Sequence, residues 1–298
     1  MEADLYAALY QLVFSIAHPH DARLRFCDRW VVLVYLLSVI HDRPVYCRPV
    51  YWACDKRHWP ESLDRALISQ SRMSRRLRTV GVLQFLERLL AAAGETAGTS
   101  LVKRIDSKPL TVGAYSKDKE AKKGRLADGL FGKGYRLHVI ADGGSFKQFL
   151  IAPLNVHDSV VGEELLPKLE GGGYVLGDNA YDTNGCHGAA ASANHQLVSP
   201  PRECNKGVRD LKYNCPERLR SLDIVDSPLE KCGPPPAFGQ ELYNSRQLIE
   251  SAFGGLTHCG LGPLPAWVRT PRRVALWSAG KMIIYMVKKA MKNNVLHA

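Results

Sequence analysis

Three acidic residues are the strongest candidates for chemistry in this sequence. Asp106 ends an apolar run that begins at Leu101, Asp178 ends one that begins at Gly173, and turn residues follow each acid. This is the pattern of a buried strand whose C-terminal end carries a carboxylate. Together with Glu250 on a helix, the acids suit Mg²⁺, which takes oxygen ligands from few carboxylates and leaves positions open for phosphate and water. We therefore predict a Mg²⁺ site at these acids, in which Mn²⁺ can replace Mg²⁺.

The segment around Glu250 has the periodicity of one amphipathic helix. At about 100° per residue, Tyr243, Arg246, Glu250 and Thr257 fall on one side of that helix. The opposite side is apolar and comprises Leu248, Ile249, Ala252, Phe253 and Leu256. The alternative to a functional site is a surface ion pair between Arg246 and Glu250, which stand at i and i+4 of an ordinary amphipathic helix.

The charge of the chain indicates a polyanionic partner. The 298 residues carry a formal net charge of +11, and 46% of them are hydrophobic, enough for the core of one large or two modest domains. After Glu250 there are seven Lys or Arg and no Asp or Glu, and residues 103–136 hold ten basic against four acidic residues. We expect nucleic acid before membrane as the partner.

Compartment and cysteine chemistry follow from what the sequence lacks. The N-terminus is acidic, without the pattern of a signal peptide, and the longest apolar run, residues 30–40, is too short to span a bilayer. Eight Cys occur without a CxxC pair. Two sets could be imagined as zinc ligands, but neither has standard spacing, so reduced thiols are favoured; the sets are Cys47, Cys54 and His58, and Cys204, Cys215 and Cys232. We expect a cytoplasmic protein.

The pattern changes from helices to strands near residue 100, after a small, polar link at residues 94–100. Two strands are expected at residues 135–141 and 146–153, joined by a hairpin signature, Asp142-Gly-Gly-Ser145. Residues 117–133 read as a basic loop without regular structure. A helix, the strand that ends at Asp178, a further helix and a short strand follow. This order indicates an α/β layer covered by helices.

Four segments, in this order, resemble the DDE transposases of bacterial insertion sequences. They are Asp106-Ser-Lys, Gly134-Tyr-Arg-Leu-His leading to His157-Asp158-Ser, Gly177-Asp178-Asn-Ala-Tyr-Asp182, and Tyr243-x2-Arg246-x3-Glu250. The resemblance covers residues 101–290. The family pattern has a Lys seven residues after the Glu, where this chain has Thr257, so we expect an active but weakened enzyme that Thr257→Lys improves.

The resemblance implies an RNase H-like fold, a mixed five-stranded sheet flanked by helices. Its first and fourth strands would carry Asp106 and Asp178, within a catalytic domain at residues 101–298. It also implies metal-assisted phosphoryl transfer on double-stranded DNA, both terminal inverted repeats and target DNA, by a homodimer that holds two ends. The bacterial relatives imply association with the nucleoid.

Six further residues are assigned roles with the same resemblance in view. Lys108, Tyr243 and Arg246 would contact DNA at the catalytic site. Asp158 and Asp182 are each expected to cap the helix that follows. His138, inside a strand, reads as a core or surface residue rather than a ligand. The gap between Asp178 and Glu250 is too short for a large inserted β domain.

Residues 1–98 read as helical and as the probable DNA-binding domain. The segment from Ser69 to Arg78 is rich in Ser and Arg, and Ser69 or Ser71 could cap a helix that bears Arg75 and Arg76. A similar segment belongs to the N-terminal DNA-binding region of the transposases that this chain resembles, and a short helix, a turn and a basic helix fit a helix-turn-helix. The alternative is a solvated basic helix face.

Two other functions compete with transposition. The first is a DNA-binding protein derived from a transposase, without catalysis, which the presence of Thr257 favours and the intact acidic triad opposes. The second is another RNase H-like nuclease, such as a junction resolvase, which the Tyr-x2-Arg-x3-Glu helix opposes. Inverted repeats that flank the gene would separate transposition from both.

Overall fold

The computed structural model describes residues 2–19, 24, 26–42, 68–95, 100–126, 129–143, 145–202, 210–225 and 238–293. The chain divides into two compact units. The helical unit comprises Met1–Ala97, Gly255–Leu261 and Pro265–Ala298, and the sheet unit comprises Gly98–Gly254 and Gly262–Leu264. Of the cysteines and histidine considered as zinc ligands, all except Cys215 lie outside the described residues, and Cys215 is a free thiol.

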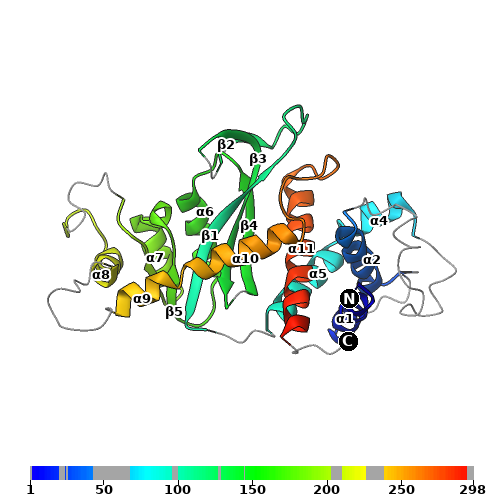
Figure 1. The fold of residues 1–298 in the computed structure, drawn as a ribbon, viewed down its shortest axis with the longest axis horizontal. Helices are drawn as coiled ribbons and strands as arrows, with labels where there is room; N and C mark the ends of the chain where they lie inside the picture. Colours follow the sequence, from blue (N-terminus) through cyan, green and yellow to red (C-terminus); the bar gives the residue numbers. More distant parts are fainter. Residues whose placement is uncertain are drawn as a thin grey trace. The chain divides into compact units, whose positions relative to one another are not determined.

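The helical unit packs the N-terminal helices around the last helix of the chain. Its helices are α1 (Glu2–Ser15), α2 (Asp28–Ile40), α4 (Gln70–Arg76), α5 (Val80–Glu95) and α11 (Pro271–Lys292). The apolar helix α2 is buried from Trp30 to Val39, as a helix that is hydrophobic all round must be. Helix α11 lies against α2 and α5 (Figure 1). No described helix is both long and apolar enough to cross a membrane.

Helix α11 thus groups with the N-terminal helices, whereas the sequence places it in one domain with the strands. Its buried side includes Trp277, Ile283 and Val287. An ion pair also joins it to the N-terminal part of the unit, because the buried Lys281 donates from Nζ to Asp42 Oδ1 at 2.6 Å. The division by compactness therefore differs from the division at residue 98 that the change of pattern suggests.

The sheet unit contains a mixed sheet with an RNase H-like strand order. The strands are β1 (Val102–Thr111), β2 (Lys122–Arg125), β3 (Phe131–Asp142), β4 (Ser145–Pro153), β5 (Gly173–Leu176) and β6 (His195–Val198). β1 pairs antiparallel with β3 and parallel with β5, and β6 extends the sheet parallel to β5. β4 and the short β2 pair with successive parts of β3 on its other edge. The expected five strands are present, and β2 is an addition inside the segment expected as a loop.

Helices cover the two faces of this sheet (Figure 1). They are α6 (Asp158–Leu165), the 3-10 turns η3 (Leu166–Lys168) and η4 (Asn179–Tyr181), α7 (Asn184–Ser192), α8 (Pro216–Val225), α9 (Phe238–Asn244) and α10 (Gln247–His258). The larger core joins α6 and α7 to one face, and a smaller core joins α9 to the other. Between Ser199 and Gln247 the described residues form helices, turns and irregular segments and no strand.

The alternation of side chains along β1 decides what each face of the sheet presents. Ile105 belongs to the core under α6 and α7, and Val102 packs against the core beside α9. Since successive residues of a strand point to opposite faces, Arg104, Asp106 and Lys108 share the face with Val102. Polar residues at every second position of one strand therefore point toward α9 and α10.

The sequence predicts a single helix across residues 243–257, but the structure has two helices that meet at residues 245–246. α9 ends at Asn244 and α10 begins at Gln247. The carbonyl of Ser245 accepts a hydrogen bond from Arg104 Nε at 2.6 Å, and its hydroxyl accepts one from Arg104 Nη2 at 3.0 Å. The N–H of Ile249 then bonds to the carbonyl of Arg246 instead of Ser245. A side chain from β1 thus holds the backbone where the two helices meet.

Helix α10 continues through two adjacent glycines, although glycine has a low helix propensity. Gly254 and Gly255 lie inside the helix, which ends at His258. A Cβ on Gly255 would stand 2.3 Å from the ring of Tyr285, so the absence of a side chain permits close packing there. Ile249 and Leu256 are buried as predicted, whereas Leu248 is exposed.

Candidate active site

Strand register brings the two aspartates together. The parallel pairing of β1 with β5 ends where Arg104 lies opposite Leu176. Continued by two residues on each chain, the same register sets Asp106 beside Asp178, at the spacing of neighbouring strands. Asp106 lies inside β1, which continues to Thr111, and not at its end as expected; only its parallel neighbour stops. Asp178 follows β5 and caps the turn η4, where its side chain accepts from the N–H of Ala180 at 3.0 Å.

Arg246 links this pair to the third acid. Its Nη1 lies 3.7 Å from Asp106 Oδ2, and its Nη2 lies 3.0 Å from Glu250 Oε1. The side chains of Arg246 and Asp106 are about four-fifths buried, whereas that of Glu250 is 58% exposed. Because Arg246 stands in the junction between α9 and α10, and Glu250 in the first turn of α10, the Arg104 contact that sets this junction also sets both residues. Arg104 is a part of the site that the sequence reasoning missed.

The pKa values of both aspartates are raised, because the carboxylates are buried and nearby positive charge does not compensate for this burial. Burial and the neighbouring Asp178 and Asp158 raise the pKa of Asp106 to about 6, although the N–H of Ser107 and the cation of Arg246 oppose the rise. The pKa of Asp178 is raised as well, chiefly by burial and then by Asp158. Burial and mutual repulsion both destabilise the charged carboxylates. A cation between them would offset this destabilisation.

Asp158 is a fourth carboxylate of the site, and its expected role as a helix cap was wrong. The cap of α6 is His157, whose ring accepts from the N–H of Ser159. The Oδ1 of Asp158 instead accepts from Arg136 Nη1 at 2.8 Å and from the hydroxyl of Ser107 at 3.2 Å. Ser107 follows Asp106 in β1 and points to the opposite face of the sheet. The contacts of Asp158 therefore hold β1 in place next to Asp106.

Two buried polar groups beside Asp158 have no hydrogen-bond partner among the described residues. The hydroxyl of Tyr181 is buried under the three aspartates, and burial followed by their charges raises its pKa well above the usual value. His138 is a core residue, as predicted, and its Nδ1 lies 3.7 Å from Asp158 Oδ1. Burial lowers its pKa to about 4, so it is neutral at pH 7.

The other residues predicted to contact DNA at this site also lie on its α10 side. Lys108 follows Asp106 on the same face of β1, with its Nζ 6.0 Å from the centre of the Phe253 ring. Burial lowers the pKa of Lys108. Tyr243 is half-buried beside Arg246 in the last turn of α9. The structure therefore brings together Asp106, Asp178, Glu250, Arg246, Lys108 and Tyr243.

Asp182 does not cap the next helix, contrary to expectation. Thr183 caps α7 by accepting from the N–H of Cys186. Asp182 is buried and paired in two-pronged fashion with Arg218 of α8, at 2.7 Å from Nε to Oδ1 and 2.6 Å from Nη2 to Oδ2. These hydrogen bonds, with those from His187 and the backbone of Arg202, lower the pKa of Asp182 to about 2 despite its burial. It is a structural ion pair.

The arginines predicted for DNA binding in the helical unit differ from one another. Arg75 is exposed on α4 and bonds only to the backbone of Ser71 in its own helix among the contacts of the described residues. Arg76 is mostly buried, donates to the carbonyl of Phe26 at 2.8 Å and forms an ion pair with Asp28. Arg76 therefore joins α4 to the start of α2, and Arg75 is the one that faces solvent.

The residues present fit a divalent cation, although no three of the described His, Cys, Asp and Glu side chains already form a metal-binding group. The positive charge between Asp106 and Glu250 is supplied here by the guanidinium of Arg246. A cation therefore already stands between two of the three predicted ligands. The pKa of Asp106 is nevertheless raised by burial and by the neighbouring carboxylates, so the single charge of Arg246 does not offset them. Oxygen donors alone make the set suitable for Mg²⁺ or Mn²⁺.

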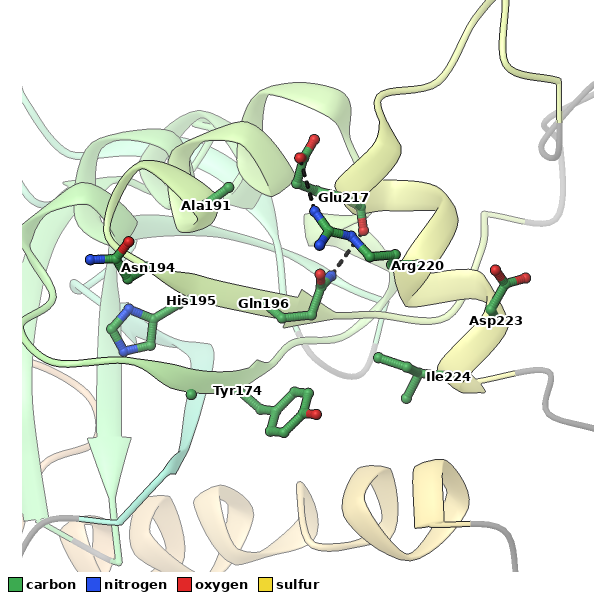
Figure 2. A pocket seen from close by; sticks show the side chains of 10 residues that line it. Tyr174, Ala191, Asn194, His195, Gln196, Glu217, Arg220, Asp223 and Ile224 are labelled. Carbon is green, nitrogen blue, oxygen red and sulfur yellow. Dashed lines mark hydrogen bonds and ion pairs between the residues drawn. The ribbon is translucent and has the colours of Figure 1, made fainter.

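A separate pocket of about 810 Å³ lies in the sheet unit between β5, β6 and α8 (Figure 2). Tyr174, Gln196 and Ile224 line it, and Arg220 points toward Glu217 at its border. It contains none of the acids of the catalytic triad. Its lining mixes apolar, acidic and basic groups, so it favours no particular ligand chemistry.

The sheet unit thus combines an RNase H-like strand order with an aspartate in β1, an aspartate that follows β5 and a glutamate on α10, the arrangement expected of an enzyme of the DDE class. Comparison with known protein families matches residues 99–287 to the family described as Transposase DDE domain. The chain belongs to this family, which supports the function of a transposase, an enzyme of the nuclease and polynucleotidyl-transferase class.

Other comparisons are more distant. The solved structure described as a cryo-EM structure of the piggyBac transposase synaptic complex with hairpin DNA aligns with 99% of this chain and 73% of that chain, at a TM-score of 0.48 and 9% identity. A search of curated proteins finds no match. The family assignment therefore rests on the family match over residues 99–287.

Proposed function

We propose that this protein is the transposase of an insertion sequence and catalyses metal-dependent strand cleavage and strand transfer at the ends of its element. The observation that carries the proposal is the convergence of Asp106, Asp178 and Glu250 around Arg246. The substrates would be the terminal inverted repeats and target DNA.

Asp106, Asp178 and Glu250 would hold the metal ions. When bound, Mg²⁺ or Mn²⁺ lowers the pKa of a water or 3′ hydroxyl and stabilises the leaving oxygen of a phosphodiester. The carboxylates themselves need no covalent role, since they place positive charge where negative charge develops on the phosphate. Their deprotonation is the first requirement, because Asp106 titrates near pH 6.

Arg246 would exchange its partner as the reaction is set up. In the protein alone it neutralises Asp106 and Glu250. With a metal ion held by Asp106, Asp178 and Glu250, the guanidinium of Arg246 would be available to bind a phosphate, which its planar fork suits. Lys108 and Tyr243 stand on the same side and would add a point charge and a stacking or hydrogen-bonding group. Asp158 would keep Ser107, and so Asp106, in register.

The helical unit would contribute recognition of the element ends. Its exposed Arg75 is the candidate for a phosphate or base contact, while Arg76 supports the position of α4 through Asp28. A homodimer would bring two ends together. Because α11 belongs to the core of this unit, the test uses the full-length protein, in which Arg75→Ala should weaken binding of end DNA; unchanged binding would exclude Arg75 from end recognition.

The test is cleavage of a labelled duplex that carries the inverted repeat from the flank of the gene. Asp106→Asn, Asp178→Asn and Glu250→Gln should each abolish cleavage in Mg²⁺ and leave DNA binding nearly unchanged. Asp223→Asn, an acid on α8, is the matched control and should cleave normally. Full cleavage by Asp178→Asn would show that the assignment of the site is wrong.

A second function has one observation in its favour. Thr257 occupies an exposed position on α10, two turns after Glu250, where the family pattern has a Lys. A protein that binds element ends without cutting them would fit a decayed site of this kind. If the natural protein shows no cleavage and Thr257→Lys restores it, this second function is correct.

A further inference from the structure

The β2–β3 arm is an ordered basic surface that the acidic site does not use. We define the arm as residues 112–126 and 129–134. It contains β2, the first part of β3 and the turn that precedes β2. The sequence reads this segment as an irregular loop, but the described residues pair in four successive positions, from Lys122 opposite Gly134 to Arg125 opposite Phe131.

Large apolar side chains of the arm lie in solvent. Tyr115 is 100% exposed, Phe131 is 77% exposed and the neighbouring Leu130 is 65% exposed. Single exposed hydrophobic residues are ordinary, but two aromatic rings on one short arm are unusual for a surface with no function. The rings offer flat faces against which other flat groups can stack.

The aromatic rings are interleaved with positive charge. Residues directly opposite each other in an antiparallel pair project to the same face. Phe131 therefore shares a face with Arg125, and Lys133 shares it with Lys123. Lys117, Lys119 and Lys122 are also exposed, and Glu120 is the only exposed acid among the described residues of the arm. The partner that matches this surface is negatively charged and carries flat apolar groups.

The arm is held in shape before any partner binds. Lys133 Nζ donates to the carbonyl of Ser116 at 2.7 Å, and the N–H of Val112 donates to the carbonyl of Lys133. The hydroxyl of Tyr135 donates to Asp118, which is buried beneath the turn. Tyr115 is thus fully exposed on a segment whose neighbours are fixed, which lowers the entropic cost of binding.

The arm is linked to Asp158, the carboxylate that also contacts Ser107 beside Asp106. Arg136 donates from Nη1 to Asp158 and from Nη2 to the carbonyl of Arg125, at 2.8 and 2.9 Å. Arg125 lies opposite Phe131. The guanidinium of Arg136 therefore connects the pair of Arg125 and Phe131 to Asp158 in the acidic site.

We propose that the β2–β3 arm binds DNA beside the cleavage site by setting Phe131 and Tyr115 against unpaired or unstacked bases, while Lys123, Arg125 and their neighbours bind the adjoining phosphates. The proposal rests on the proposed function for the nature of the partner. Aromatic rings that stack on bases within a basic groove are how proteins hold single strands, and apolar side chains can also wedge between base steps. The arm would hold strand ends open for the chemistry at Asp106 and Asp178.

The test compares two labelled DNAs with the full-length protein, a fully paired duplex and the same duplex with one unpaired base. The natural protein should prefer the duplex with the unpaired base. Phe131→Ala should remove this preference and weaken binding of that duplex by roughly fivefold to a hundredfold, the range for one lost base stack. Binding of the paired duplex should change by less than about twofold, and Phe131→Trp should restore the preference.

The charged residues give a different signature. Lys123→Gln should weaken both DNAs equally and reduce the slope of log affinity against log salt by about one, the value for one phosphate contact. Tyr213→Ala, an exposed aromatic residue beside Lys212, and Lys168→Gln are matched controls outside the arm and should change neither DNA.

Failure of the proposal is distinguishable from failure of the proposed function. If the natural protein cleaves element ends and Asp178→Asn does not, but Phe131→Ala behaves as Tyr213→Ala does, the function stands and the role of the arm is refuted. If Phe131→Ala instead shifts the monomer–dimer equilibrium and leaves DNA binding intact, the exposed rings contact a second copy and the proposal is also refuted.

Discussion

Two pairs of aspartate and arginine in the sheet unit are built from the same chemistry and behave in opposite ways. Asp182 and Arg218 are buried, with two hydrogen bonds at 2.6 and 2.7 Å, and the pKa of Asp182 is lowered to about 2. Asp106 and Arg246 stand 3.7 Å apart, and the pKa of Asp106 is raised to about 6. The first arginine satisfies its carboxylate, and the second does not.

The difference lies in what else surrounds each carboxylate. Asp182 receives hydrogen bonds from Arg202 and His187 as well as Arg218. Asp106 has Asp178 and Asp158 as neighbours, and its arginine is shared with Glu250. Around Asp182 several donors serve one acid, whereas around Arg246 several acids share few donors, as we expect for the proposed cation site.

The largest effect should come from removing the cation of the structural pair. Arg218→Ala leaves a buried carboxylate uncompensated and should lower the free energy of unfolding by about 3–5 kcal/mol. Arg246→Ala, the matched change at the site, should lower it by less than about 1 kcal/mol, because Glu250 is 58% exposed and the contact from Arg246 Nη1 to Asp106 Oδ2 is 3.7 Å long. Urea unfolding of both variants measures the difference. Equal losses would mean that the two pairs are not different in kind.

The two pairs should also give stability opposite dependences on pH. The folded pKa of Asp106 is raised from 3.8 to about 6, so between these values the folded protein keeps a proton that the unfolded chain has released. Stability from this group is present below pH 4 and is lost as pH rises through about 6. The loss is on the order of 1–3 kcal/mol. For Asp182 the stability is present above pH 4 and is lost as pH falls toward about 2.

Urea unfolding of the metal-free protein at pH 5 and pH 7 tests the first of these dependences. Asp106→Asn resembles the protonated acid, so this variant should be the more stable protein at pH 7 and lose less stability between the two values. Excess Mg²⁺ should stabilise the natural protein at pH 7 and not the variant. If Asp106→Asn were less stable than the natural protein at pH 7, this result would contradict the raised pKa of Asp106.

Arg104 should matter more for the rate than for binding. Arg104→Lys keeps the charge but loses the forked contact to Ser245, so the junction between α9 and α10 should loosen and misplace Arg246 and Glu250. A displacement of about 1 Å in such a site can cost up to about a hundredfold in rate. Cleavage at saturating DNA should therefore fall while DNA affinity changes little. Ser245→Ala keeps the carbonyl contact and should show a smaller decrease.

The smallest effect is expected at Thr257. A Lys at this exposed position of α10 adds one mobile charge on the side of Glu250, worth about 1 kcal/mol or roughly fivefold in end binding. Binding and cleavage of the labelled terminal duplex measure the gain, with Thr270→Lys, outside α10, as the matched control. If Thr257→Lys changes neither binding nor rate, the role of the family Lys does not transfer to this chain.

The sequence by itself determined the elements that local periodicity encodes. Alternation and apolar runs indicated the strands that carry Asp106 and Asp178, and helical spacing indicated the exposed side of Glu250. The order of strands and helices indicated an α/β layer, and the resemblance of four ordered segments to DDE transposases implied the RNase H-like sheet. Such signals survive because they depend on neighbours a few residues away.

Tertiary structure alone decided the details that depend on distant partners. The helix around Tyr243 breaks because Arg104, 141 residues away, holds Ser245. Asp158 holds the strand of Asp106 in place because Arg136 and Ser107 donate hydrogen bonds to it. Asp182 is structural because Arg218 donates to it. A carboxylate at the start of a helix has the same local sequence signature whether it caps that helix or binds a guanidinium from elsewhere. Only the three-dimensional position of the partner distinguishes the two roles.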